Sequence, residues 1–297
     1  MVLSYNNFKR YPQGGKSVYI KVDYQRKGVD RLSNTKHQKY NHIEFIQTMC
    51  DNGNVLAGSH ILPMRYGAVF IIDSSMPHCT APKDANNYVR NCMTVDKPSF
   101  DRFINAVSAN DILYDLYRDG VYFAVPDKDN IEKVKGIFKE FDRLRQAAAP
   151  ETDYYYQMLK LMLLLRDSSV VSGNYSEDRT TVGKALAYLD RNLALGVSTQ
   201  ETAEALHINK HYLCHVFKKK TGMTLSEYLL DKRLMLANQL LSDHSLSIFD
   251  VSVRVGFSSE SYFISKYKQR YGIPPGKKRA LEAKDIATAK GTDNDEL

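Results

Sequence analysis

The sequence is poor in the features that mark secreted and membrane proteins. Its 297 residues hold only four cysteines, which show neither CxxC pairs nor the spacing of a zinc site. No apolar run approaches the roughly 18 residues that a membrane-spanning helix needs. The opening stretch, MVLSYNNFKR, has no apolar segment, so we expect no signal peptide. These absences predict a protein of the cytoplasm with reduced thiols and no disulfide framework.

Tryptophan is also absent, but the composition is otherwise that of a globular protein, with 43% hydrophobic and 25% charged residues. The length favours two domains. The formal net charge of +7 is unevenly spread, because residues 181–279 carry +7, residues 1–180 carry +3 and residues 280–297 carry −3. A positive excess in one segment is typical of a phosphate-binding surface, although a solvated lysine-rich surface would give the same charge.

The first 125 residues or so alternate short apolar runs with turn residues, a pattern that indicates a small barrel or sandwich. Residues 127–147 then change period, with apolar side chains at spacings of three and four on one face of a helix. A second helix is expected at 152–167. Strands are expected at 18–22, 42–49 and 68–72.

Residues 168–179 are rich in Ser, Gly and Asn and form the expected linker. From Thr180 to Gly276 the chain has the pattern of consecutive helices. Residues 281–297 are polar, acidic at their end and without periodicity, so we expect a disordered tail.

A basic and aromatic cassette occurs twice in the positively charged segment, 50 residues apart. The aligned pairs are Tyr212 and Tyr262, Leu213 and Phe263, Phe217 and Tyr267, Lys218 and Lys268, Lys220 and Arg270, and Gly222 and Gly272. Each copy has the pattern of two short helices joined by a tight turn, which is a helix-turn-helix.

Helix boundaries follow from capping residues. In the first copy, Ser198 and Glu201 fit a capping box before a helix at 199–206, and Asn209 can cap a helix at 210–221 that Gly222 ends. In the second copy, Ser247 can cap a helix at 248–255. Ser258 or Ser259 can cap the next helix, which ends at Gly272.

The segment between the copies, 225–241, has no Pro or Gly and is expected to form one helix about 25 Å long. Successive major-groove faces on one side of B-DNA lie about 34 Å apart. A stiff helix of that length, with the half-widths of its flanking units, would set two recognition helices one turn apart. The repeat therefore predicts a single chain that reads two adjacent grooves.

The segments HINKHYLCHVFKKKTGMTLSEYLLDKRLMLANQLL and DVSVRVGFSSESYFISKYKQRYGIPP resemble the DNA-binding domain of the AraC/XylS family of bacterial transcription regulators. The resemblance keeps the order, spacing and GF-S-S-x-S-Y-F signature of that domain. It departs at Ser252, where the family usually has Ala, and at Thr202, where an apolar residue is common. Lys278 stands where an aromatic usually precedes the final Arg279, which leaves the end of the domain open.

Family members read bases from the outward face near the start of each recognition helix. By position, this implies base contacts from His211, Cys214 and His215 in the first helix and Glu260, Ser261 and Ser265 in the second. Glu260 could accept from a cytosine amino group, and the histidines could donate to guanine or phosphate. Phosphate contacts are expected from Lys218, Lys219, Lys266 and Lys268. The alternative for each of these side chains is an ordinary solvated surface position.

Residues 37–82 resemble, less fully, the cupin sensor barrel of the same family, through a strand–proline–His segment at 67–78 and HIEF at 42–45. The resemblance makes His42, Glu44 and His78 the candidate effector-pocket residues, with a structural histidine as the alternative for His78. Metal-binding cupins need a histidine pair ahead of the glutamate, and those positions hold Gln38 and Tyr40, so we expect no metal. The alternative is that His37, His42, Glu44 and His78 converge on a metal by another register.

Together these features predict an α+β two-domain protein. Residues 1–167 would form a cupin-like β-barrel with dimerisation helices, and residues 180–280 an all-α domain with two helix-turn-helix units. The helices at 127–147 and 152–167 resemble the dimerisation element of the family, although they could pack only on their own barrel.

The predicted function is sequence-specific DNA binding by a transcription regulator, an activator, that responds to a small molecule; the resemblance implies a carbohydrate. Expected partners are double-stranded DNA, a second copy of the chain and RNA polymerase, with no membrane, no cofactor and no enzymatic activity. The expected location is the bacterial cytoplasm, at the nucleoid. One alternative is a ligand-independent repressor or architectural DNA-binding protein with a degenerate barrel. Another, a cupin enzyme with a nucleic-acid anchor, lacks a metal triad and a nucleophile–base pair.

Overall fold

A computed structural model describes residues 20–28, 42–107, 120–166, 169–170 and 180–281, and these fall into two compact units. The N-terminal unit holds the described residues up to 170, and the C-terminal unit holds residues 180–281. Most of the predicted linker, together with the predicted tail beyond 281 and the positions of His37, Gln38 and Tyr40, lies outside the described residues. No helix in the described ranges is both long and apolar enough to cross a membrane.

Two antiparallel sheets form the N-terminal unit. The larger has the strand order β1 (Ile20–Lys27), β7 (Val89–Asp96), β2 (His42–Thr48), β5 (Val69–Asp73), β8 (Val121–Val125) and β9 (Ser169–Val170). The smaller has the order β4 (His60–Pro63), β3 (Gly53–Ala57) and β6 (His78–Pro82). Strands β1 and β9 are the edges of the larger sheet among the described residues. The structure therefore shows a sheet-rich unit, and a closed cupin barrel stays a prediction.

Ser169 and Val170 pair with β8, so the predicted linker is wrong for these two residues. A second correction concerns α2 (Lys97–Ala106), which lies where only strands were expected. Asp96 caps this helix by accepting from the backbone N–H of Ser99 at 3.0 Å. Pro98 lies in its first turn, where its missing N–H costs nothing. Both signals were present in the sequence, but the surrounding β-rich pattern obscured them.

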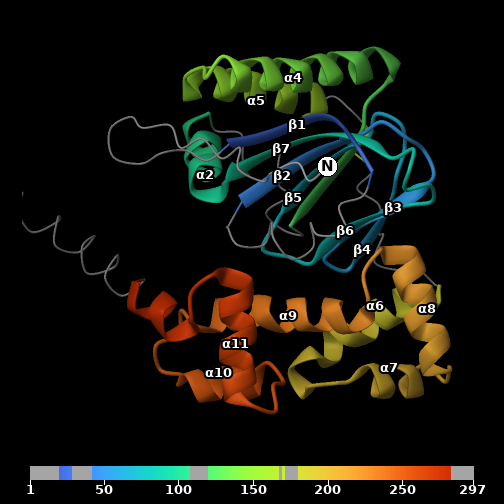
Figure 1. Ribbon diagram of the computed structural model, residues 1–297, viewed down its shortest axis with the longest axis vertical. Helices are drawn as coiled ribbons and strands as arrows, with labels where there is room; N and C mark the ends of the chain where they lie inside the picture. Colours follow the sequence, from blue (N-terminus) through green and yellow to red (C-terminus); the bar gives the residue numbers. More distant parts are fainter. Residues whose placement is uncertain (1–19, 29–41, 108–119, 167–168, 171–179, 282–297) are drawn as a thin grey trace, which may run out of the picture. The chain divides into compact units, whose positions relative to one another are not determined.

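The two predicted long helices are confirmed as α4 (Lys128–Gln146) and α5 (Glu151–Arg166). They pack together, and α4 also contacts β1 and β7, so the pair covers one face of the larger sheet (Figure 1). The buried stripe of α4 is the one that the periodicity predicts: Val134, Ile137, Phe138, Phe141 and Leu144. A second core lies on the opposite face of the sheet, where Phe70 and Phe123 stack with ring centroids 4.8 Å apart.

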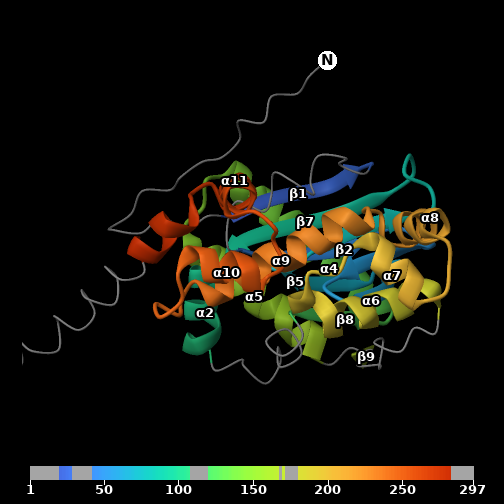
Figure 2. The ribbon, with the colours of Figure 1, turned by 90° about the horizontal axis from the view of Figure 1, so that it is seen from below.

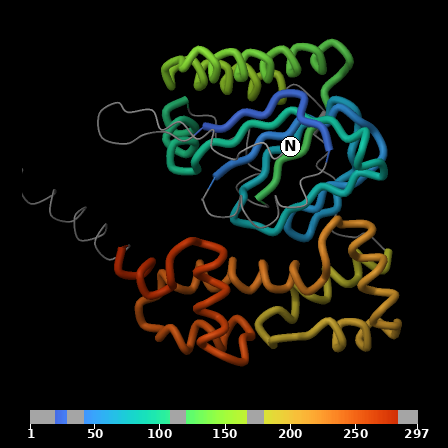
Figure 3. The backbone as a smooth tube through the Cα atoms, in the orientation of Figure 1, coloured from blue at the N-terminus to red at the C-terminus, as the bar shows by residue number. Residues whose placement is uncertain are grey.

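The described part of the C-terminal unit is helical. Its elements are α6 (Thr181–Asn192), the 3₁₀ turn η4 (Leu193–Leu195), α7 (Thr199–Ala205), α8 (Lys210–Thr221), α9 (Leu225–Leu240), α10 (Ile248–Arg254) and α11 (Glu260–Tyr271). Two views of this unit agree that α7 and α8 lie at one end of α9, while α10 and α11 lie at the other (Figures 1 and 2). The path of the chain shows α9 as the connection between the two helix pairs (Figure 3).

Every helix predicted between 199 and 272 is confirmed to within one residue at its C-terminal end. Ser198 and Glu201 form the expected capping box, as do Ser247 and Asp250. Asn209 caps α8, and of the two candidates for α11 the cap is Ser259. Local side-chain-to-backbone hydrogen bonds therefore set these boundaries, which is why the sequence alone predicts them.

Candidate functional site

The two recognition helices, α8 and α11, each bury a stripe with an aromatic anchor and expose the opposite face. In α8 the side chains of Leu213 and Phe217 are fully buried, and the Phe217 ring meets Tyr228 of α9 edge-on at 5.6 Å. In α11 the buried counterparts are Phe263 and Tyr267. These anchors fix which face of each helix points away from the core.

The predicted base-reading residues of α8 share its outer face. His211 and His215 are exposed and Cys214 is partly buried, and all three lie at spacings of three or four with the exposed Lys218. In α11, Ser261, Ser265 and Lys268 are exposed at the same kind of spacing, while Glu260 is partly buried at the start of the helix. Each helix therefore presents one row of the predicted side chains.

The four lysines that are predicted to contact phosphate differ in the exposure of their side chains. Lys218, Lys219 and Lys268 are exposed. Lys266 is partly buried, its Nζ donates to Gln269 Oε1 at 3.2 Å, and it lies 5.5 Å from the centre of the Tyr262 ring. To reach a phosphate, Lys266 would have to leave those two partners.

Two exposed tyrosines occupy equivalent positions that the sequence reasoning aligned but gave no role. Tyr212 is 53% exposed and Tyr262 is 52% exposed, and each lies two positions after the first residue of its recognition helix. Their backbone N–H groups donate to the caps, Asn209 at 3.3 Å and Ser259 at 3.3 Å. An aromatic ring in the same exposed place in both copies is the signal that could have identified them.

Polar contacts hold the second helix pair, α10 and α11, and the residues that follow it against α9. Arg270 Nη1 lies 2.6 Å from Asp231 Oδ1, and Tyr267 donates its hydroxyl to Asn238 Oδ1 at 2.6 Å. Past α11, Lys278 Nζ donates to the carbonyl of Asn238 at 3.0 Å. Arg279 extends the same packing by donating to the carbonyl of Leu246 at 2.7 Å. Lys278 thus has a structural role although it departs from the family pattern.

The candidate effector-pocket residues come together in the N-terminal unit. His78 Nε2 lies 3.3 Å from Glu44 Oε2, and His78 Nδ1 lies 2.9 Å from the carbonyl oxygen of Met76. Both ring nitrogens of His78 therefore face oxygen atoms that can accept a hydrogen bond. The thiol of Cys92, which the sequence reasoning did not select, donates to Glu44 Oε1 at 3.0 Å. Only the pairing of β2 with β7 brings Cys92 to this point.

Glu44 is charged within this cluster. Burial raises the pKa of its carboxyl group, but the hydrogen bond and the positive charge of His78 outweigh burial, aided by Cys92 and His42. The net result is a pKa well below the ordinary value. Burial and the nearby Glu44 charge raise the pKa of the Cys92 thiol. Among the described residues, no group of three or more His, Cys, Asp and Glu side chains is arranged to hold a metal ion.

The depressed pKa of Glu44 predicts an acid-sensitive contribution to stability. A carboxyl group with a lower pKa in the folded state stabilises the fold above its unfolded pKa, and the contribution is lost as pH falls towards the folded value. The free energy of unfolding lost on changing Glu44→Gln should therefore shrink between about pH 7 and about pH 3. Thermal unfolding of both proteins across this range measures it, and a difference independent of pH would contradict the ion pair.

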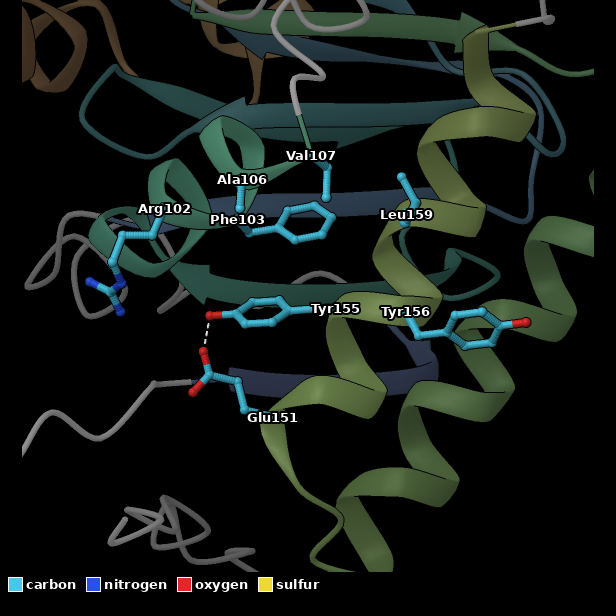
Figure 4. Close-up of a pocket in the computed structure, with 8 residues that line it drawn as sticks. All are labelled: Arg102, Phe103, Ala106, Val107, Glu151, Tyr155, Tyr156 and Leu159. Carbon is cyan, nitrogen blue, oxygen red and sulfur yellow. Dashed lines mark hydrogen bonds between the residues drawn. The ribbon is translucent and has the colours of Figure 1, made fainter. Parts of the chain in front are cut away.

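A crevice of about 490 Å³ lies between α2 and α5 (Figure 4). The Phe103 ring stacks on Tyr155 at 5.1 Å, and the Tyr155 hydroxyl donates to Glu151. Burial raises the pKa of Glu151, with Arg102 acting in the opposite direction. The sequence pattern gave no indication of this crevice, because only strands were expected where α2 lies.

The match to a protein family lies in the C-terminal unit. Residues 202–280 match the helix-turn-helix domain family. The chain is 31% identical over 117 residues to the HTH-type transcriptional activator RhaS of Escherichia coli O1:K1 / APEC, covering 39% of this chain and 42% of that protein. It is 30% identical over 111 residues to the HTH-type transcriptional regulator CdhR of Pseudomonas aeruginosa, covering 37% of this chain and 33% of that one. The chain thus spans less than half the length of these curated relatives.

Among solved structures, a transcriptional regulator of Chromobacterium violaceum with an AraC-type DNA-binding domain is 30% identical, with a TM-score of 0.33. The match covers 36% of this chain and 96% of that one. The family match at 202–280 includes both recognition helices, α8 and α11, and the α9 connection between them. Residues 202–280 thus form a helix-turn-helix domain similar to those of DNA-binding transcription regulators, among them one with an AraC-type DNA-binding domain.

Proposed function

We propose that this protein binds DNA sequence-specifically as a transcription regulator, with α8 and α11 each reading one major groove. The observation that carries the proposal is the pair of capped recognition helices in one unit, each exposing a polar row opposite an aromatic anchor. The net charge of +7 over residues 181–279 supports attraction to the phosphate backbone.

Base reading is assigned to His211, Cys214 and His215 on α8, and to Glu260, Ser261 and Ser265 on α11. None offers the bidentate geometry of an arginine on guanine, so specificity is spread over several modest contacts. The exposed rings of Tyr212 and Tyr262 lie beside these rows and are suited to contacts with the sugar–phosphate backbone or thymine methyl groups.

The sharpest test of base reading is Glu260→Ala. Because a carboxylate accepts from the cytosine amino group, its removal should relax the base preference at one position by a factor equivalent to about 1–3 kcal/mol. Binding to all single-base variants of a selected site, at fixed salt, measures this preference. Glu204→Ala is the matched control, since it removes the same charge from the exposed face of α7. If Glu260→Ala changed all sites equally, as the control should, the assignment would fail.

We further propose that the N-terminal unit binds a small-molecule effector and shifts the equilibrium between states of the DNA-binding unit. Carbohydrates are the first class to screen. The relative named a transcriptional activator supports activation, which would involve RNA polymerase in the bacterial cytoplasm. Saturating effector at 100 times its dissociation constant should stabilise the protein by about 2.7 kcal/mol. A thermal-shift screen measures this effect.

Dimerisation is proposed through the outer faces of α4 and α5. A groove of about 710 Å³ runs along them, and Leu163 is exposed there. Sedimentation of the wild-type protein and of Leu163→Glu distinguishes a dimer through this face from a monomer.

A second candidate function is a ligand-independent DNA-binding repressor or architectural protein. It is favoured by the pairing of Glu44 with His78 and Cys92, because these polar groups satisfy one another without a ligand. The absence of any stabilising compound in a broad thermal-shift screen would support it.

A further inference from the structure

The two helix-turn-helix halves touch at a second place besides α9. Gly196 follows η4 ahead of α7, and Gly256 lies in the turn between α10 and α11. A Cβ atom placed on Gly256 would lie 2.5 Å from Gly196 Cα and 3.1 Å from Gly196 N. No real Cβ approaches backbone atoms so closely, so the two backbones pack directly on each other.

The first copy supplies an internal control for this glycine. Its turn residue His207, one position after the C-cap Leu206, occupies the place that Gly256 holds after the C-cap Val255. His207 has φ +54°, and Gly256 has φ +83°. The left-handed conformation therefore tolerates a side chain in this turn, at a cost of about 1–2 kcal/mol. The contact with Gly196, rather than the conformation alone, explains the glycine at 256.

Arg233, from the middle of α9, lies against the same contact. Its Nη2 donates to the carbonyl of Val197, the residue after Gly196, at 2.9 Å. Its Nε lies 3.3 Å from the Cβ position of Gly256, and this nitrogen is buried without a hydrogen-bond partner among the described atoms. Burial lowers the pKa of the Arg233 guanidinium, opposed by Glu201. A buried guanidinium whose N–H groups are not all hydrogen-bonded lowers the stability of the fold. Its presence here therefore needs an explanation.

The preceding residues of α9 bind each half separately. Asp231 pairs with Arg270 of α11 in the second half, and Lys232 lies 2.9 Å from Asp190 of α6 in the first. Arg233 reaches from α9 to the point where the halves meet. Because α9 connects the two halves along a single axis, one half could rotate about that axis relative to the other. A contact between residues outside α9, such as Gly196 with Gly256, opposes this rotation.

We propose that Gly196, Gly256 and Arg233, together the glycine junction, set the spacing and rotation of the two half-sites that the protein accepts. Arg233 is a positioning residue that acts through α8 and α11 and touches no base. The inference rests on the proposed function, in which both helices read DNA. One added base pair moves a half-site by about 3.4 Å and turns it by about 35°, which a fixed pair of recognition helices cannot follow.

The test measures binding of the full chain at fixed salt to probes whose two elements are separated by the selected spacing, or by one base pair more or less. Probes with only one element complete the set. The wild type should prefer the selected spacing by about tenfold, and Arg233→Met should reduce that preference to about threefold or less. Its affinity for one-element probes should stay unchanged. Arg233→Lys should restore part of the preference, because it keeps a donor near Val197.

Lys232→Met is the matched control, since it removes a cation from α9 together with its ion pair to Asp190 of the first half. It should keep the spacing preference. Gly256→Ala tests the junction independently, because the added Cβ must force the two backbones apart, and it should also lose the preference or move it to another spacing.

The outcomes separate the two proposals. If Arg233→Met and Gly256→Ala both keep the wild-type spacing preference, the junction has no role in spacing, while the DNA-reading function stands. If the wild type shows no preference between spacings, the junction proposal is overturned as well. If the wild type discriminates no sequence on any probe, the proposed function fails and the junction proposal fails with it.

Discussion

Replacing Arg270 with alanine should cost the C-terminal unit about 3–5 kcal/mol of unfolding free energy, enough to unfold much of it. The loss arises because the partner of Arg270, Asp231, stays buried after the substitution. Arg270 Nη1 lies 2.6 Å from Asp231 Oδ1, and the two side chains are only 3% and 13% exposed. Removing the guanidinium leaves a carboxylate buried between α9 and α11 without its cation. Urea unfolding followed by far-ultraviolet circular dichroism measures the loss.

A double variant separates the contribution of the ion pair to stability from that of side-chain packing. Replacing both partners with apolar residues of similar size, Arg270→Met with Asp231→Leu, should recover most of the loss, because no charge then stays buried. If Arg270→Ala alone unfolded within about 1 kcal/mol of the wild type, the ion pair would not hold the second half to α9.

Removing Lys218, Lys219, Lys266 and Lys268 together, as alanines, should flatten the salt dependence of DNA binding. Each phosphate contact contributes about 0.9 to the slope of log affinity against log salt, so four lost contacts reduce the slope by roughly 3 to 4. Affinity for unrelated DNA should fall with affinity for the selected site, since phosphate contacts carry no base information. Titrations of fluorescent duplexes over a range of salt concentrations give the slope.

The control is a set of four exposed basic side chains in the N-terminal unit that do not line the α4–α5 groove, Lys27, Arg65, Lys83 and Lys128, changed to alanine in the same way. The net charge falls equally in both proteins. An equal loss of slope in the control would mean that overall charge, rather than the recognition helices, governs the attraction. Because Lys266 pairs with Gln269, its single variant should give the smallest change of the four.

Where structure depends on neighbouring residues, the sequence predicted it closely. The caps Ser198, Asn209 and Ser247 bond to backbone groups two or three residues away, so helix ends were visible in the sequence. The repeat indicated two equivalent halves, and its aromatic spacing indicated the buried face of each recognition helix. The net charge of the segment pointed to the kind of partner.

Where structure depends on residues far apart in the sequence, the sequence did not predict it. Cys92 meets Glu44 only because β7 pairs with β2, and that register was not predictable. The contact of Gly196 with Gly256 joins loops 60 residues apart, so each glycine alone suggested only an ordinary turn. Helix α2 was missed although Asp96 and Pro98 marked its start, because the apolar runs around it fitted strands as well.

Selection from random DNA with the purified protein at physiological salt would show whether one chain reads two adjacent grooves. We expect enriched sites with two short elements about 10 to 10.5 base pairs apart, centre to centre. A further block of the same form would indicate a dimer. Enrichment of a single short element would contradict that expectation, because one of the two helix-turn-helix units would then bind DNA without reading its sequence.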